Sequence, residues 1–363
     1  MAGGFVGAYL LQLGFGLPLA LVTHATILAL RCGLRLVAIE VVRRIGAFGA
    51  LILGAVLGAF GFLPLLLAAE PAWLAIWIVT VALTETIYWP MYHAASAAAV
   101  AEAGALGRQL AERSMLGALV SVVGPLFGGA LLTGLGEAAG FAIAALVCLL
   151  SILPLIRLTP PAVGPVPRLR ETVCGADRRA VAIFAAEGWI AAGVGYAWPI
   201  VMFASMGASY EAFGSSNAVA GLAGALASFL CGRAIDRGRR EAYVPLVCAA
   251  LGAGILLRAA STWSPFAALL ANASGAAVAG CYGPVVYSMI YERAKRTGAA
   301  YRFHLAAEAG WDGGAVAGLL AAALVAASVP TMSLAVLPAL LGVVAMQACL
   351  RPPRRMLAAA AAG

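Results

Sequence analysis

Charged residues are scarce in this chain of 363 residues. Only 10% of the residues are Asp, Glu, Lys or Arg, whereas 63% are hydrophobic. A soluble domain carries about 25% charged residues, so a soluble chain of this length could not cover its surface with so few. The surface must therefore face lipid. Because Ala and Gly dominate and alternating β-branched stretches are few, we expect membrane-spanning helices and not a β-barrel.

Motifs for enzymatic or nucleotide chemistry are also lacking. The sequence contains no nucleophile elbow, phosphate-binding loop, HExxH sequence or metal-ligand spacing. The seven cysteines form no CxxC pair, and most of them fall inside apolar segments. We interpret them as small buried residues, not as disulfides or zinc ligands. The sequence therefore predicts no metal, no cofactor and no enzymatic activity.

Long apolar segments predict twelve membrane spans, each needing about 20 apolar residues. The predicted spans cover residues 5–15 (a short one), 18–37, 46–69, 71–93, 114–134, 139–157, 180–206, 212–231, 240–263, 265–289, 308–328 and 333–351. The longest polar connection runs from Arg157 to Arg179 and is rich in proline, which removes backbone donors and disfavours a membrane helix. We therefore predict an N-terminal helical bundle over 1–157, a central loop over 158–179, and a C-terminal bundle with a short tail over 180–363.

Basic residues gather on one side of these predicted spans. Of the 23 Lys and Arg residues, only Arg258 falls on the other side, and Arg31 and Arg35 are counted among the loop residues. Short loops rich in Lys and Arg face the cytoplasm, so we expect the central loop and the C-terminus on the cytoplasmic side of the inner membrane. The net charge of +8 is then a topology and lipid signal, and we expect no nucleic-acid partner.

The two halves carry an internal repeat, because several positions recur 194 residues later. The matches are Tyr88-Trp89-Pro90 with Tyr282-Gly283-Pro284, Arg43 with Arg237, Arg108 with Arg302, and Gly124 with Gly318. Shifting spans two to six by this offset places each of them on a span of the second half. The partner of the seventh span would begin before Met1. We therefore expect a truncated first span, through an upstream start codon or a truncated gene; the alternative is a genuine eleven-span variant with a half-helix.

A basic motif follows the eighth span. The segment from Gly232 to Arg240 reads G-R-A-I-D-R-G-R-R and resembles the G-x-x-x-D-R-x-G-R-R signature of the major facilitator superfamily, with one residue missing after Arg237. The resemblance implies a gating cluster of Gly232, Asp236, Arg237, Arg239 and Arg240, which can hold the two halves closed on one side. The alternative is plain positive-inside anchoring.

A second motif lies in the fifth span. Gly124, Pro125, Gly128 and Gly129 are similar to the superfamily's G-P-x-x-G-G antiporter motif, although Val120 stands where that motif has an earlier glycine. Glycines permit close helix approach; ordinary small-residue packing is the alternative. The resemblance covers the whole chain. It implies an all-α membrane protein of the major facilitator type, with two pseudo-symmetric six-helix bundles, eleven full spans and a shortened first span.

Ionisable residues within spans are costly and point to function. In the fourth span, Glu85, Tyr88 and Tyr92 share one predicted helix face, and Trp89 and His93 flank it. Lipid would tolerate this polar and aromatic stripe poorly. We predict that it faces a central cavity and forms part of a substrate or proton pathway; a buried hydrogen-bonded network without a ligand is the alternative.

Two further spans contain candidate pathway residues. Glu187 and Trp198 share a face of the seventh span, although Glu187 can instead lie at the membrane interface. His304, Glu308 and Asp312 follow one another at four-residue spacing near the start of the eleventh span. We interpret His304 and Glu308 as a solvated helix start and keep Asp312 as a pathway candidate. His24, alone in its span, is interpreted as a core residue.

These features predict a monomeric secondary transporter that moves a small solute by rocking two halves around a midplane site. Proton coupling is favoured because membrane carboxylates are present and ATP-binding motifs are not, and the antiporter-like motif favours export. A membrane-embedded enzyme and a non-transporting sensor are the alternatives; the first would need convergent catalytic groups and the second a large soluble domain. Aromatic residues beside carboxylates suit a cationic or amphipathic solute, but also many neutral ones.

Overall fold

The computed structural model describes residues 2–102, 106–158, 163–235 and 240–350. Within these ranges the chain forms helices joined by short turns and contains no strand. Nine of the described helices are long and apolar enough to cross a membrane, and Leu17–Gly33 is a shorter apolar helix. The prediction of an all-α membrane fold is therefore confirmed.

Breaks at glycine divide the helices of the first half. These helices are α1 (Ala2–Gln12), α2 (Leu17–Gly33), α3 (Arg35–Phe60), α4 (Phe62–Leu66), α5 (Pro71–Glu102), α6 (Leu106–Leu150) and α7 (Ile152–Arg157). Gly46 inside α3 and Gly136 inside α6 have φ values of 73° and 79°, a region that glycine enters without a steric cost. A Cβ on Gly140 would meet the Leu132 side chain at 2.7 Å, so the chain folds back at Gly136. Thus α6 holds the fifth predicted span and most of the sixth, whose last residues form α7.

The second half begins with a short helix inside the predicted central loop. Its elements are α8 (Leu169–Cys174), α9 (Arg178–Ala191), the π-helix η1 (Ala192–Ala197), α10 (Trp198–Ser205), α11 (Tyr210–Ile235), α12 (Arg240–Ala260), α13 (Pro265–Arg296), α14 (Ala300–Ser328), the 3₁₀-helix η2 (Met332–Val336) and α15 (Ala339–Leu350). The Asp177 carboxylate caps α9 by accepting hydrogen bonds from the backbone N–H groups of Arg179 and Ala180, which is why α9 begins at Arg178. At six residues, α8 is too short to span a membrane.

The 194-residue repeat is visible in the helix boundaries. Both Pro71–Glu102 (α5) and Pro265–Arg296 (α13) contain 32 residues, and their first and last residues are related by the same offset. The starts of α6 at Leu106 and α14 at Ala300 obey it too. Proline is favoured at the first helical position because its missing N–H would have no partner there. The two halves therefore share one helical pattern, as the repeat predicts.

The most extensive contacts between the halves pair α2 with α14 and α6 with α11. A Cβ on Gly129 of α6 would meet the α11 backbone at 2.6 Å, and one on Gly214 of α11 would meet the carbonyl oxygen of Pro125 at 2.4 Å. A Cβ on Gly128 would meet the ring of Phe5 in α1 at 2.9 Å, and Gly124 is buried. The predicted helix-packing motif thus lies where α6 and α11 approach too closely for side chains.

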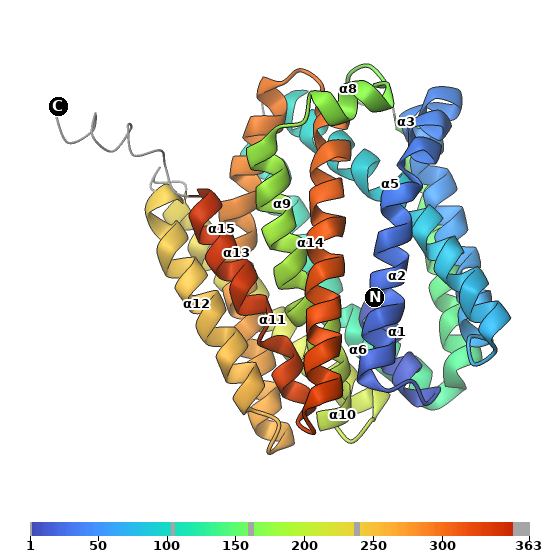
Figure 1. Cartoon of the computed structure of the whole chain (residues 1–363), viewed down its shortest axis with the longest axis vertical. Helices are drawn as coiled ribbons and strands as arrows, with labels where there is room; N and C mark the ends of the chain where they lie inside the picture. The colour runs from blue at the N-terminus through green and yellow to red at the C-terminus, as the bar shows by residue number, and fades with distance from the viewer. Residues whose placement is uncertain (1, 103–105, 159–162, 236–239, 351–363) are drawn as a thin grey trace.

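Figure 1 shows the bundle from the side, with α8 at one end and α10 at the other; we call these the α8 end and the α10 end. The first turns of α14 lie near the α8 end, because α14 packs against α8. The turn between α1 and α2 lies at the α10 end (Figure 1).

One pair of cysteines corrects the sequence prediction. Cys231 of α11 and Cys281 of α13 form a disulfide, with their Cα atoms 5.6 Å apart. A Cβ on Gly280 of α13 would meet the carbonyl oxygen of Gly224 in α11 at 2.3 Å. This close packing brings the two cysteines together although 50 residues separate them in the sequence, so the interpretation of all seven cysteines as unpaired was wrong.

Candidate functional site

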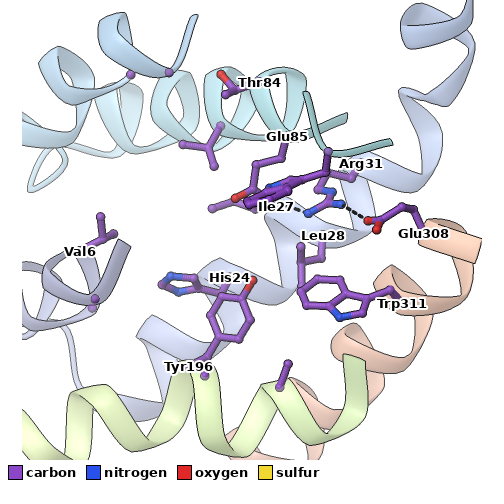
Figure 2. A pocket seen from close by; sticks show the side chains of 18 of the residues that line it. Val6, His24, Ile27, Leu28, Arg31, Thr84, Glu85, Tyr196, Glu308 and Trp311 are labelled. Atoms are coloured by element: carbon purple, nitrogen blue, oxygen red, sulfur yellow. Dashed lines mark hydrogen bonds and ion pairs between the residues drawn. The ribbon is translucent and has the colours of Figure 1, made fainter. Parts of the chain in front are cut away.

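A cavity of about 600 Å³ lies between the two halves. The first half contributes lining residues from α1 to α5, and the second half contributes them from α9, η1, α10, α13 and α14. Most of the lining side chains are apolar or aromatic, and a few ionisable groups reach in from α2, α5 and α14 (Figure 2). A cavity between repeated halves is where transporters of this architecture bind their solutes.

Two buried arginines connect the halves at the wall of this cavity. Arg31 of α2 donates to Glu85 of α5 at 2.7 Å and to Glu308 of α14 at 3.2 Å, as Figure 2 shows. The same guanidinium lies 3.1 Å from Oδ1 of Asp312, and Arg35 pairs with the other oxygen of Asp312. We call these five residues the ionic cluster.

Helix spacing explains the geometry of the ionic cluster. Glu308 and Asp312 are four residues apart on α14, so they share one face, and this face lies toward α2. The side chains of Arg31 and Asp312 are 3% and 0% exposed, whereas that of Glu85 is 28% exposed. Burying a charge is costly unless it is paired. Arg31, Glu85 and Glu308 all line the cavity, and Glu85 is the most exposed of the three.

The sequence interpretation of three members of the ionic cluster, and of the nearby His304, was wrong. Arg31 and Arg35 were assigned to a loop, but α2 runs into α3 with only Leu34 between them, and the chain breaks later, at Gly46. His304 and Glu308 were interpreted as solvated, but both are buried. Two arginines and two acidic residues, each pair at four-residue spacing, formed the signal that could have identified this site.

The cavity face of α5 also differs from the predicted one. Glu85, Trp89 and His93 line the cavity, whereas Tyr88 and Tyr92 pack into a hydrophobic cluster that includes α3 residues. The ring of Tyr88 stacks on that of Tyr92, with centroids 5.7 Å apart. Four residues advance a helix by about 40° beyond one turn, and three fall about 60° short of it. Residues 85, 89 and 93 therefore stay on the cavity side, where α5 meets α14.

A cluster of rings surrounds His93 on the α8 side of the ionic cluster. The His93 Nδ1 atom lies 3.0 Å from the Tyr291 hydroxyl, and its Nε2 atom lies 3.7 Å from Glu308. Its ring stacks on those of His304 and Tyr287, at centroid distances of 5.5 Å and 6.4 Å. Neither ring nitrogen of His304 has a hydrogen-bond partner among the described residues. These rings join α5 of the first half to α13 and α14 of the second.

Glu187 belongs to a separate group in the second half. Its carboxylate accepts hydrogen bonds from the hydroxyls of Tyr282 and Tyr287, the latter at 3.4 Å. Tyr287 also lines the cavity. Glu187 therefore contacts a residue of the cavity wall, Tyr287, and is not a member of the ionic cluster.

Trp198 is not among the residues that line the cavity. Its indole N–H donates to the side chain of Asn272 at 2.8 Å, and its ring lies 5.5 Å from the Arg258 guanidinium. The π-helix η1 just before it places Tyr196 in the cavity instead. Short π-helical segments often occur at functional sites.

The ring of His24 contacts that of Tyr196, with the centroids 5.0 Å apart, as Figure 2 shows. Its Nδ1 atom lies 2.8 Å from the backbone carbonyl oxygen of Ala20. The interpretation of His24 as a core residue was wrong, because its ring lines the cavity.

Part of the predicted gating motif lies outside the described residues. Asp236, Arg237 and Arg239 fall in the gap between 235 and 240, Gly232 belongs to the end of α11, and Arg240 begins α12. The gating role stays a prediction.

A bundle of apolar helices in two repeated halves around a shared cavity is the architecture of a secondary transporter. The chain belongs to the Major Facilitator Superfamily, whose sequence profile matches residues 25–301. The predicted family is confirmed, and the protein is a multi-pass membrane protein and a transporter. No curated protein sequence matches the chain significantly.

Several solved transporters share the fold at low sequence identity. The fucose:proton symporter of E. coli has a TM-score of 0.60 and 14% identity, over 96% of each chain. A bacterial homologue of the iron transporter ferroportin has a TM-score of 0.59 and 13% identity, over 96% of this chain and 94% of that one. The human organic anion transporter TETRAN has a TM-score of 0.57 and 14% identity, over 96% of this chain and 89% of that one.

Proposed function

We propose that this protein is a proton-coupled secondary transporter that exports a small solute across the cytoplasmic membrane by alternating access. The ionic cluster is the observation that carries this proposal. It joins α2 and α5 of the first half to α14 of the second at the wall of the shared cavity. The central loop and the C-terminus lie on the cytoplasmic side, as the basic residues indicate.

The charges of the ionic cluster do not balance, which supports proton binding. Two guanidinium groups face three carboxylates, so the cluster carries one excess negative charge when all five groups are ionised. An uncompensated buried charge is costly. One proton, held on a carboxylate or on His93 beside Glu308, balances the cluster.

The position of the cluster links that proton to the movement of the halves. The cavity opens toward the α8 end only if α14 moves away from α2 and α5, and this movement breaks the contacts of Arg31 with Glu308 and of Arg35 with Asp312. In the separated arrangement water reaches the cluster, and its excess charge no longer needs a proton. Proton binding therefore favours the closed arrangement, in which the excess charge is buried, and such a difference between two states is what couples a ligand to a conformational change.

The proposed direction rests on the antiporter-like motif of α6. Its Gly129 and Pro125 meet α11 at the second contact between the halves, where a change of helix packing would accompany rocking. The fucose:proton symporter with the same fold supports proton coupling but not export, since symport and export run in opposite directions.

Transport in liposomes tests the proposal. The purified full chain is screened by thermal shift against a solute library, and each solute that stabilises it is assayed for accumulation driven by a pH gradient and for counterflow without a gradient. We expect Glu308→Gln to lower gradient-driven accumulation at least tenfold while counterflow persists. Glu70→Gln, which changes an exposed carboxylate between α4 and α5, is the matched control. Accumulation that is independent of the pH gradient would overturn proton coupling.

A further inference from the structure

We infer that the cavity binds a monovalent organic cation with an aromatic body. The ammonium group of this cation pairs with the Glu85 carboxylate in place of Arg31. This inference rests on the proposed function, because it places the transported solute in the cavity shared by the halves.

The charge that faces the cavity is negative. The side chain of Glu85 is 28% exposed, whereas that of its partner Arg31 is 3% exposed and that of Glu308 is 6% exposed. Figure 2 shows the Glu85 side chain reaching from α5 toward the Arg31 guanidinium. Both side chains line the cavity, but a solute in it finds the Glu85 carboxylate far more accessible than the Arg31 guanidinium.

An anionic solute would find the guanidinium already occupied. Arg31 contacts Glu85, Glu308 and Asp312 within 3.2 Å, and it also lies 5.6 Å from the ring centroid of Trp311. An added anion would raise the excess of negative charge. A cation has the opposite effect. When an ammonium group pairs with Glu85, Arg31 keeps its other two carboxylates, so every charge in the cluster has a partner.

A neutral polyhydroxylated solute would find few polar groups to bind. The Thr84 hydroxyl donates to the Thr80 carbonyl of its own helix at 2.8 Å, and the Nδ1 atom of His24 lies 2.8 Å from the Ala20 carbonyl. These side chains line the cavity but satisfy hydrogen bonds within their own helices. A sugar site instead needs several unsatisfied donors and acceptors that converge, because each buried polar group of the solute requires a partner.

The remaining walls suit an aromatic body. Tryptophan and tyrosine rings line the cavity from both halves, at Trp77, Trp89, Tyr196 and Trp311. Aromatic rings attract organic cations through their faces and pack against apolar rings. The acidic group and the aromatic walls thus favour the same class of solute.

The charge balance also implies that the cation and the proton compete for binding to the ionic cluster. Either one alone neutralises the single excess negative charge of the cluster, and binding both would leave an excess positive charge. Cation binding should therefore release a proton, and affinity should fall as the pH falls. Such competition makes the two ligands exchange across the membrane.

A series of probes with one skeleton and different charges tests the inference. The probes are 2-phenylethylammonium, neutral 2-phenylethanol and anionic 3-phenylpropionate, with ethylammonium lacking the ring and L-fucose as a sugar. Binding to the purified full chain is measured by titration calorimetry in two buffers of different ionisation enthalpy, which counts the protons released. The alkylammonium group stays protonated throughout the neutral range, so a released proton comes from the protein.

We expect 2-phenylethylammonium to bind at least tenfold more tightly than the other four probes and to release up to one proton. Glu85→Gln should weaken its binding at least tenfold, and Glu70→Gln should leave it unchanged. Glu85→Asp, which keeps the charge, should retain part of the binding and shows that the site still folds. Tighter binding of 3-phenylpropionate, 2-phenylethanol or L-fucose, or cation binding that is unaffected by Glu85→Gln, would overturn the inference.

The outcomes for the inference and for the proposed function are separable. If the cation binds through Glu85 but no solute is accumulated in response to a pH gradient, the proposed proton coupling fails and the inference stands. If Glu308-dependent accumulation is found for a neutral or anionic solute, the proposed function stands and the inference fails.

Discussion

The Nη1 atom of Arg31 lies 2.7 Å from the Oε2 atom of Glu85, although 54 residues separate them and they belong to different helices. The other end of the same guanidinium contacts Glu308, 277 residues away in the second half. One arginine thus pairs with the most exposed carboxylate of the ionic cluster in the first half and with a buried carboxylate of the second half. In our proposal Glu85 binds the solute and Glu308 couples the proton, two roles that a single carboxylate would otherwise combine.

Substitution of Glu85 should affect solute binding, and substitution of Glu308 should affect coupling. We expect Glu85→Gln to lower both gradient-driven accumulation and counterflow at least tenfold, a loss of about 1.4 kcal/mol or more in binding. Glu308→Gln should lower accumulation alone. Both assays are run in the same liposomes over a pH series. Normal accumulation by Glu85→Gln would exclude Glu85 from the mechanism and direct attention to Asp312 and Glu187.

Removal of one partner from the buried pair of Arg35 and Asp312 should destabilise the protein. Arg35→Met leaves Asp312 with its contacts to Arg31 and to the Cys32 thiol, and breaking a buried ion pair typically costs about 3–5 kcal/mol. Thermal unfolding in detergent is the measurement. Arg43→Met breaks the exposed pair of Arg43 with Glu40 and should change stability by about 0–1 kcal/mol. Equal effects of the two substitutions would contradict a paired, buried Asp312.

A methyl group at Gly129 should disturb the contact between α6 and α11. Its Cβ would lie 2.6 Å from the α11 backbone, so the helices would have to move apart, at a cost of about 1–3 kcal/mol. Gly134→Ala is the control on the same helix, because no atom lies within 4 Å of a Cβ there. We expect a lower unfolding temperature for Gly129→Ala only. An unchanged unfolding temperature would show that α6 and α11 do not approach this closely.

A pH-dependent contribution to stability should come from Asp177, at the start of α9. Burial raises the pKa of its carboxyl group, but hydrogen bonds from Arg293 and from the backbone N–H of Ala180 outweigh burial and hold the pKa below its usual value. Stabilisation from a lowered pKa is complete above the ordinary carboxyl value of about 3.9 and is lost as the pH falls through the lowered value.

Asp177→Asn keeps a side chain that can cap the helix but removes the charge that pairs with Arg293. The unfolding temperature of wild type should exceed that of Asp177→Asn at neutral pH, and this difference should disappear at acid pH. The effect should be small, because the Arg293 side chain is 44% exposed and solvent weakens such pairs. A difference that grows on acidification would contradict a lowered pKa.

The class and architecture of the protein were determined by the sequence itself. Scarce charge leaves lipid as the only solvent for the surface, and a spanning segment in lipid must satisfy its backbone hydrogen bonds within a helix. The repeat at 194 residues relates the boundaries of α5 to those of α13, because local signals such as Pro71 and Pro265 start helices wherever they occur. Glu85 was identified as well, since a carboxylate in a span is costly wherever its partners lie.

Only the tertiary structure decided which charged residues pair with one another in the ionic cluster. An arginine near a predicted span boundary resembles a loop residue, and only contacts with Glu85 and Glu308, far away in the sequence, make burial of Arg31 possible. In the same way, packing of α14 against α2 turned a helix start that sequence treats as solvated into part of the ionic cluster. Local pattern determines which segments become helices. Which of their charges are buried depends on whether another helix brings the opposite charge within a few ångströms.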